Sequence, residues 1–138
     1  IIDLLKLNFD KFNDNKILNL HLKNFNEEAK ILFKDEINYA LGNIIQNAIL
    51  YSITKVEIYL KTNEKELIIK ISDDGYGFSK DVLDKLGEPY ISKNNKGMGL
   101  GIFISKNLIE NMKGSIVFYN TVKNNAVVEI KFDKAILL

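Results

Sequence analysis

Hydrophobic and polar residues follow two different periods along this chain, and the periods predict its elements. Apolar residues at helical spacing predict helices over residues 1–12, 35–52, 79–86 and 100–112. Period-two and β-branched runs predict strands over residues 16–25, 56–61, 66–72, 115–121 and 126–133, with a short further strand over 29–33. A short polar turn joins the runs over 56–61 and 66–72 into one hairpin, and another joins the runs over 115–121 and 126–133 into a second. Helices mixed with paired strands favour an α/β fold, a two-layer sandwich in which about three helices cover one face of a mixed β-sheet.

Length and composition describe one ordinary globular domain, residues 1–138. Of the 138 residues, 46% are hydrophobic and 27% are charged, the usual balance of a soluble domain. The net charge of +1 gives no reason to expect a nucleic acid or a membrane surface as partner. The chain lacks cysteine, which excludes disulfides and thiolate metal sites. All 19 basic residues are lysines, so a phosphate would have to be bound without the bidentate hydrogen bonds of an arginine guanidinium.

Two asparagines form the first candidate site. Asn43 and Asn47 are four residues apart on one face of the helix predicted over residues 35–52. Asparagine is a poor residue for a helix interior, so this pair among apolar neighbours needs a reason. One interpretation is a polar stripe that faces water. The other is a pair of oxygen ligands for Mg²⁺, which takes a few protein oxygens and leaves its other positions to water and phosphate.

The second candidate is the sequence SDDGYGF, which follows an apolar strand. It contains Asp73, Gly75 and Gly77 in a D-x-G-x-G pattern. Asp-Gly is a common turn dipeptide, so a plain turn is one explanation. The alternative is that Asp73 ends the strand facing a pocket and accepts a hydrogen bond from an amino group, the partner that a buried carboxylate needs. The two glycines would then let the backbone pass close to the ligand.

The third candidate is a set of alternate glycines, Gly97, Gly99 and Gly101, that leads into the helix predicted over residues 100–112. Free backbone N–H groups at the positive end of a helix dipole favour phosphate. No Gly-Lys-Ser/Thr follows, so this is no Walker loop, and it follows a loop rather than the strand of a dinucleotide-binding fingerprint. The pattern fits a phosphate-binding loop or a bare glycine-rich turn.

In order and spacing, NIIQNA, DDGYG and GMGLGIFI resemble the N box and the two glycine boxes of the ATP-binding catalytic domain of two-component sensor histidine kinases. That domain has the Bergerat fold of the GHKL superfamily, which it shares with DNA gyrase, the heat-shock chaperone ATPase and mismatch-repair ATPases. The resemblance covers residues 32–132, and three motifs in register are far more specific than one. Within the kinases, ALGNIIQNA, VLDKLGEPYIS and GMGLGIFI look closest to the redox-responsive RegB/PrrB branch.

The resemblance implies that one end of the site binds adenine. Asp73 would accept the adenine amino group, with Gly75 and Gly77 beside it. Tyr51 stands where the family places an aromatic ring against adenine, although a core or surface tyrosine is an equal alternative.

The other end of the site would bind the phosphates and the metal. The residues of the second glycine box are Gly97, Gly99, Leu100 and Gly101. Asn47 would coordinate Mg²⁺, with Asn43 as its neighbour or as a second ligand. Residues 87–96 would form a mobile lid over the nucleotide.

Several positions depart from the family pattern. Leu50 replaces a common lysine, so Lys93 or Lys96 would supply that phosphate contact, unless both are solvated loop lysines. Asn43 stands where ATPases of the superfamily have a glutamate that activates water. An amide cannot take that proton, so ATP would be bound but hydrolysed poorly, which favours transfer to a separate acceptor. His21, the only histidine, lacks the acceptor context and is expected to be structural or exposed.

We therefore expect the catalytic half of a protein-histidine kinase, which binds Mg-ATP and donates the γ-phosphate to a histidine on a domain absent from this chain, for relay to a response regulator. Alone, it would bind ATP or ADP without autophosphorylation. It would be the cytoplasmic domain of a bacterial, membrane-anchored sensor, with no direct membrane or nucleic-acid contact. Residues 1–12 would be a helix of this domain or the end of a linker helix from a missing dimerisation and acceptor domain. The alternatives are a GHKL-type ATPase and a nucleotide-binding interaction module of anti-sigma type.

Overall fold

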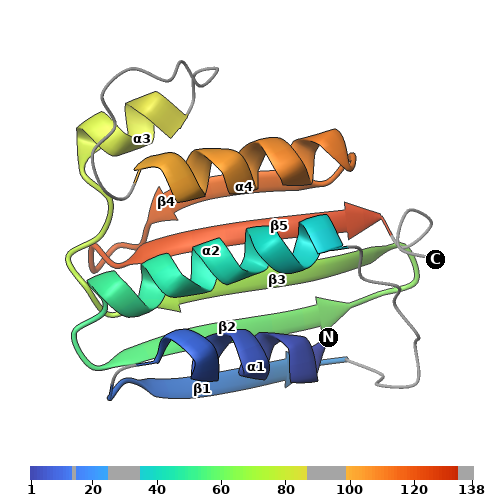
Figure 1. Cartoon of the computed structure of the whole chain (residues 1–138), viewed down its shortest axis with the longest axis horizontal. Helices are drawn as coiled ribbons and strands as arrows, with labels where there is room; N and C mark the ends of the chain where they lie inside the picture. The colour runs from blue at the N-terminus through green and yellow to red at the C-terminus, as the bar shows by residue number, and fades with distance from the viewer. Residues whose placement is uncertain (14, 25–34, 87–98, 134–138) are drawn as a thin grey trace.

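The computed structural model describes residues 1–13, 15–24, 35–86 and 99–133, and these form four helices and one five-stranded sheet (Figure 1). In chain order the elements are α1 (Ile2–Phe12), β1 (Ile17–Lys23), α2 (Asp35–Tyr51), β2 (Lys55–Thr62), β3 (Glu66–Asp73), α3 (Lys80–Leu86), α4 (Gly99–Asn111), β4 (Ser115–Asn120) and β5 (Ala126–Asp133). Every helix and strand predicted within these parts is present, with ends at most two residues away. The short strand expected over residues 29–33 lies outside the described residues. No helix in the described parts is long and apolar enough to cross a membrane.

The sheet is mixed, as predicted, with the strand order β1-β2-β3-β5-β4. β1 runs parallel to β2, and all other neighbouring strands are antiparallel. The β2–β3 hairpin turns at Asn63, whose side-chain oxygen accepts hydrogen bonds from the backbone N–H groups of Lys65 and Glu66. β3 is the central strand, so its last residue, Asp73, lies midway along the row of strand ends that closes one end of the sheet.

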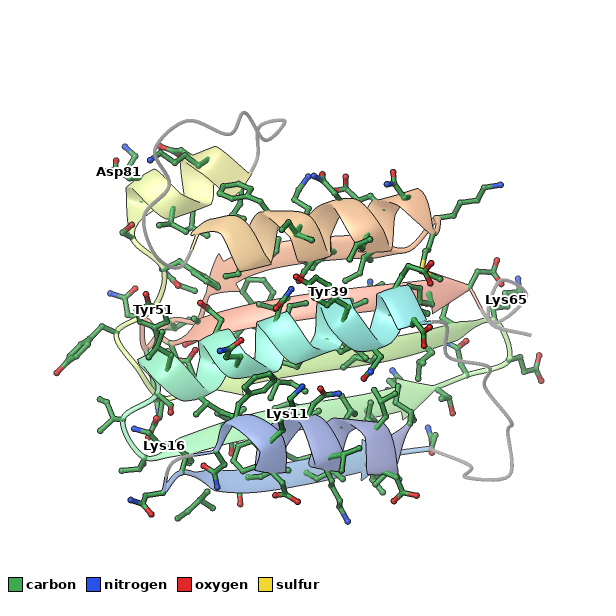
Figure 2. The ribbon with its side chains drawn as sticks, in the orientation of Figure 1. Lys11, Lys16, Tyr39, Tyr51, Lys65 and Asp81 are labelled. Atoms are coloured by element: carbon green, nitrogen blue, oxygen red, sulfur yellow. The ribbon has the colours of Figure 1, made fainter. Side chains whose placement is uncertain are left out.

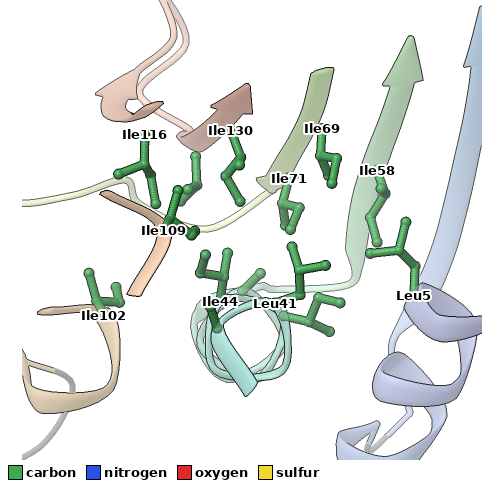
Figure 3. Packing of buried hydrophobic residues seen from close by; sticks show 14 of the residues in the cluster. Leu5, Leu41, Ile44, Ile58, Ile69, Ile71, Ile102, Ile109, Ile116 and Ile130 are labelled. Atoms are coloured by element: carbon green, nitrogen blue, oxygen red, sulfur yellow. The ribbon is translucent and has the colours of Figure 1, made fainter. Parts of the chain in front are cut away.

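The helices cover one face of the sheet. Along β3 the buried residues alternate, and Leu67, Ile69 and Ile71 are at most 1% exposed. α2 lies between α1 and α4 over this face (Figure 1). Its buried residues Leu41 and Ile44 pack toward the isoleucines of β3 (Figure 3). The central helix is therefore fixed against the central strand, and this pair carries four of the predicted site residues, Asn43, Asn47, Tyr51 and Asp73.

α1 belongs to the same hydrophobic core. Leu5 is fully buried and points toward Ile58 of β2, and Phe9 is 3% exposed (Figure 3). Between the helices, Asn8 Nδ2 donates a hydrogen bond to Asn38 Oδ1 of α2 at 2.9 Å. Packing of this apolar face places α1 beside α2 instead of extending it away from the sheet.

In the described part of the chain no helix covers the opposite face of the sheet (Figure 1). The rings of His21 and Tyr59 stack there, with centroids 4.4 Å apart, and His21 Nε2 lies 3.6 Å from the Glu57 carboxylate. These residues and Ser72 line a hollow of about 960 Å³. Because side chains alternate along a strand, Asp73 points to the helix side, away from this hollow. The single histidine is therefore exposed and remote from the predicted site.

Candidate functional site

Asp73 is a buried carboxylate at the end of β3. Its side chain is 6% exposed, and its Oδ1 accepts a hydrogen bond from the Gly75 N–H at 2.9 Å. The pKa of Asp73 is raised to about 6. Burial is the largest cause and the charge of Asp74 adds to it, while the hydrogen bond from Gly75 acts in the opposite direction. A carboxylate has about four acceptor positions, so Asp73 can receive an amino group from a ligand.

Gly75 lies against the last turn of α2. A Cβ atom built on Gly75 would come 2.1 Å from the carbonyl oxygen of Tyr51 and 2.8 Å from Asp73 Oδ1. Only glycine fits this approach of two backbones. Tyr51 is the final residue of α2 and is 45% exposed, so its ring is available beside the end of β3. The structure thus brings Asp73, Gly75 and Tyr51 together.

Gly77 has a packing role of its own. Its φ of +81° is in the left-handed region, and a Cβ there would lie 2.4 Å from the Asn124 carbonyl oxygen. The Asn120 side chain accepts from the Phe78 N–H at 2.7 Å and donates to the Phe78 carbonyl at 2.8 Å. The Phe78 ring meets Phe118 edge-on at 6.0 Å. Contacts with the β4–β5 hairpin therefore explain Gly77 without a ligand.

Asn43 and Asn47 are both half-buried on α2, and Asn43 faces the start of α4. A Cβ on Gly101 would lie 3.7 Å from Asn43 Cγ, at ordinary contact distance. In the described part of the chain the buried Nδ2 of Asn43 has no hydrogen-bond partner. A buried donor without a partner lowers the stability of the fold, so a further group that accepts a hydrogen bond from this Nδ2 would bind favourably.

The second glycine box opens a helix, as predicted. α4 begins at Gly99, and Leu100 and Gly101 lie in its first turn. The hydroxyl of the fully buried Ser105 lies 2.9 Å from the Gly101 carbonyl and 3.1 Å from the Ala40 carbonyl of α2. The two helices are therefore closely packed at this end. Four predicted features lie outside the described residues: Gly97, Lys93, Lys96 and the lid over residues 87–96.

Two residues beside Tyr51 and Asp73 that form hydrogen bonds in this part of the structure were not predicted from the sequence. Asp74 accepts hydrogen bonds from Ile53, Thr54 and Lys55, the residues that follow α2. Lys16 donates from Nζ to the carbonyls of Ser52 and Ile53. The sequence signal for Asp74 is indistinguishable from a turn, and Lys16 has no signal at all.

One face of α2 therefore spans both glycine segments. Gly75 lies against Tyr51 at the end of the helix, and Gly101 lies against Asn43, eight residues earlier. At 1.5 Å per residue, these points are about 12 Å apart along the helix. Among the described residues no cluster of three His, Cys, Asp or Glu side chains could bind a metal, so a metal here would depend on amide oxygens and on the ligand. This arrangement is the one that the sequence resemblance predicts for a nucleotide-binding α/β domain.

The chain matches, over residues 34–136, the family described as "Histidine kinase-, DNA gyrase B-, and HSP90-like ATPase". It therefore belongs to this family of ATP-binding domains, and the resemblance seen in the three motifs is confirmed. ATP binding is the function of the domain. A solved structure of the mycobacterial sensor histidine kinase MprB has the same fold, with a TM-score of 0.73 at 14% identity, covering 96% of this chain and 93% of that one.

Curated relatives are sensor kinases of bacteria. The putative sensor histidine kinase NtrY-like of Rickettsia conorii is 30% identical over 103 residues, 71% of this chain and 17% of that protein. The sensor histidine kinase RegB of Cereibacter sphaeroides is 31% identical over 101 residues, 65% of this chain and 22% of that protein. Sporulation kinase A of Bacillus subtilis is 28% identical and covers 73% of this chain and 17% of that protein. RegB is thus among the relatives, and the chain spans about a fifth of the length of the relatives it matches.

Proposed function

We propose that this chain is the Mg-ATP-binding catalytic domain of a sensor histidine kinase. The domain would donate the γ-phosphate of ATP to a histidine on a dimerisation and acceptor domain outside this chain, for relay to a response regulator. The observation that carries the proposal is the placement of both glycine segments on one face of α2, with Gly75 at Tyr51 and Gly101 at Asn43. An extended nucleotide along this face would have its purine at one end and its phosphates at the other.

Each end of the face has groups suited to its part of the nucleotide. Asp73 would accept the adenine amino group, and the Tyr51 ring would lie against the base. The N–H groups at the start of α4, at Gly99 to Gly101, would receive the phosphates. Mg²⁺ would be held by the side-chain oxygen of Asn47, with Asn43 as its neighbour or second ligand, and the Asn43 Nδ2, which has no hydrogen-bond partner among the described residues, would donate to a phosphate oxygen. Gly97 and either Lys93 or Lys96, which lie outside the described residues, would complete the proposed phosphate contacts.

The residue at position 43 favours transfer over hydrolysis. An amide does not accept a proton from water near neutral pH, so Asn43 cannot act as a general base for hydrolysis. Phosphoryl transfer depends mainly on positioning and charge stabilisation, which a metal and helix N–H groups supply. We therefore propose that the isolated domain binds nucleotide without phosphorylating itself. We also propose that it is the cytoplasmic part of a membrane-anchored bacterial sensor.

Calorimetric titration of the folded chain tests the proposal. ADP and ATP should bind, and Mg²⁺ should tighten ATP binding, whereas steady-state ATP hydrolysis should stay close to background. GTP is the matched control, because it has a carbonyl oxygen where adenine has its amino group and would face the Asp73 carboxylate with an acceptor. A folded chain that binds neither ADP nor Mg-ATP at millimolar concentration would rule out the proposal. Equal affinity for GTP would rule out the role of Asp73.

A further inference from the structure

We infer that Asp74 and Lys16 are positioning residues for the adenine end of the site, and that they act through the turn between α2 and β2. This inference rests on the proposed function, because it concerns how tightly adenine nucleotides bind. The turn, residues 52–55, directly follows Tyr51. Its conformation therefore decides where the end of α2, with its aromatic ring, lies relative to Asp73 on β3.

Asp74 binds one side of this turn. Its carboxylate accepts hydrogen bonds from the backbone N–H groups of Ile53 at 2.8 Å, Thr54 at 3.0 Å and Lys55 at 3.2 Å, and from the Thr54 hydroxyl. Three consecutive N–H groups converging on one carboxylate make an anion-binding nest whose anion is part of the protein. Charge-assisted hydrogen bonds of this kind are about twice as strong as neutral ones.

Lys16 binds the other side of the same turn. Its Nζ donates hydrogen bonds to the carbonyl oxygens of Ser52 at 2.8 Å and Ile53 at 2.9 Å. These carbonyls directly follow α2, where the helix dipole is negative and a cation is favourable. Lys16 and Tyr51 lie at the same end of the molecule (Figure 2). An ammonium group and a carboxylate thus hold the carbonyls and the N–H groups of one short segment.

The held segment leads directly to the adenine end. The Tyr51 carbonyl is so close to Gly75 that a Cβ there would approach it to 2.1 Å. Gly75 in turn donates its N–H to Asp73. A shift of the turn would therefore move Tyr51, the glycine and the Asp73 carboxylate relative to one another.

The two adjacent carboxylates have different tasks. Both oxygens of Asp74 are already bonded to the turn, whereas Asp73 has a single described donor. Burial of Asp74 opposes its ionisation, but the hydrogen bonds from the Thr54 hydroxyl and from the N–H groups of Thr54, Lys55 and Ile53 lower its pKa to about 2. Asp74 is therefore ionised near neutral pH, and both of its carboxylate oxygens are bonded to the turn. Asp73 remains available for a ligand.

A double-mutant cycle on ADP affinity tests the inference. Asp74→Ala should weaken ADP binding about tenfold, the scale of one lost charge-assisted interaction. Tyr51→Ala should weaken it as well. In the Tyr51→Ala background, Asp74→Ala should weaken ADP binding by a smaller factor than in the wild type, because the part of its effect that acts through the Tyr51 ring is gone while the part that acts through Gly75 and Asp73 remains. A general loss of stability would lower the melting temperature in both backgrounds without producing this non-additivity.

Milder variants keep the test valid if Asp74→Ala fails to fold. Asp74→Asn retains one acceptor oxygen and should weaken ADP binding only a few-fold, and Lys16→Met, which keeps the aliphatic stem, should do the same. Asp10→Ala, on the exposed side of α1, is the matched control and should have no effect. Additive effects of Asp74 and Tyr51, or unchanged ADP affinity in Asp74→Asn and Lys16→Met, would overturn the inference. Failure of the wild-type chain to bind ADP would instead reject the proposed function, and the inference with it.

Discussion

The two ends of the site on α2 differ in how firmly the protein itself fixes them. At the end proposed for adenine, Asp74 and the close contact of Gly75 with Tyr51 bind the end of α2 to β3, and Lys16 binds the following turn to the start of β1. At the phosphate end, Gly101 makes only ordinary contact with Asn43, whose Nδ2 has no partner in the described part of the chain. The end proposed for adenine is thus held in place by the protein, although Asp73 keeps acceptor positions for a ligand, whereas the end proposed for phosphate has a buried amide without a partner among the described residues.

This difference indicates a division of labour. If this end binds adenine as proposed, its preformed geometry would give affinity and base specificity, since little ordering would be needed on binding. An incomplete phosphate end leaves polar groups for Mg²⁺ and the phosphates, the parts of the ligand that react. Stability and binding should therefore respond differently to substitutions at the two ends. Three predictions test this, in order from the largest expected effect to the smallest.

The largest effect is expected at the two glycines. Gly75→Ala should destabilise the domain by about 3 kcal/mol or more, because its Cβ would lie 2.1 Å from a backbone oxygen that cannot yield. Gly101→Ala is the matched control: its Cβ finds a nearest neighbour at 3.7 Å, and alanine in a helix should stabilise by up to about 1 kcal/mol. Urea unfolding of both variants measures the comparison. Similar stabilities for the two would show that the adenine end is not rigid.

The next effect is expected at Asp73, where affinity and stability should change in opposite directions. The folded state raises the pKa of this group from 3.8 to about 6, so it binds a proton more tightly than the unfolded chain does. Its contribution to stability is therefore present below pH 4 and is lost as the pH rises through 6, at a cost of about 2–3 kcal/mol above that pH. Asp73→Asn removes this titration, and should stabilise the free domain at pH 7.5 by about 2 kcal/mol while weakening ADP binding at least tenfold.

Unfolding and ADP titrations from pH 4 to pH 8 measure both parts of this prediction. Most of the stability gain of Asp73→Asn should be lost at pH 4, where the wild-type carboxyl is protonated in the folded state and about half protonated in the unfolded chain. ADP binding to the wild-type chain near pH 6 should release protons, because the ligand favours the ionised carboxylate. A gain that is constant across this pH range, or unchanged ADP affinity, would contradict the assignment of Asp73.

The smallest effect on stability is expected at Asn43. Asn43→Leu replaces an amide with an unsatisfied buried donor by an apolar group of similar shape, so the free energy of unfolding should stay level or rise by about 1 kcal/mol. The Mg²⁺-dependent part of ATP binding should nevertheless weaken several-fold. Gln46→Leu, on the exposed face of the same helix, is the control. A Mg²⁺ response equal to that of the wild type would remove Asn43 from the metal site.

Local patterns predicted the elements well because their causes are local. The period-two run over residues 126–133 became β5 without a change of boundary, and Gly99 to Gly101 open α4 as expected. Asp73 was predicted at the end of a strand, and it lies there, buried. Each of these features depends on residues within one or two turns of a helix or along one strand.

The reasons for the glycines could not be predicted in the same way. The pattern left two reasons open for Gly75 and Gly77, a plain turn or room for a ligand. The structure adds close contacts that the pattern did not contain, of Gly75 with the Tyr51 backbone and of Gly77 with Asn120 and Asn124. Asp74 looked like part of a turn, although its partners are about twenty residues earlier in the chain. Contacts at such sequence separations leave no local periodicity, so only the folded chain reveals them.

The sequence by itself determined which segments are helices and strands, and which three motifs resemble those of the family of ATP-binding domains. The tertiary structure decided that the motifs share one face of α2, that one of two adjacent carboxylates is free for a ligand while the other is bonded to the backbone, and that Lys16 reaches the same turn. The physical reason is that propensity and periodicity act between near neighbours, whereas pairing of charges and close approach of backbones depend on the packing of α2 against β3.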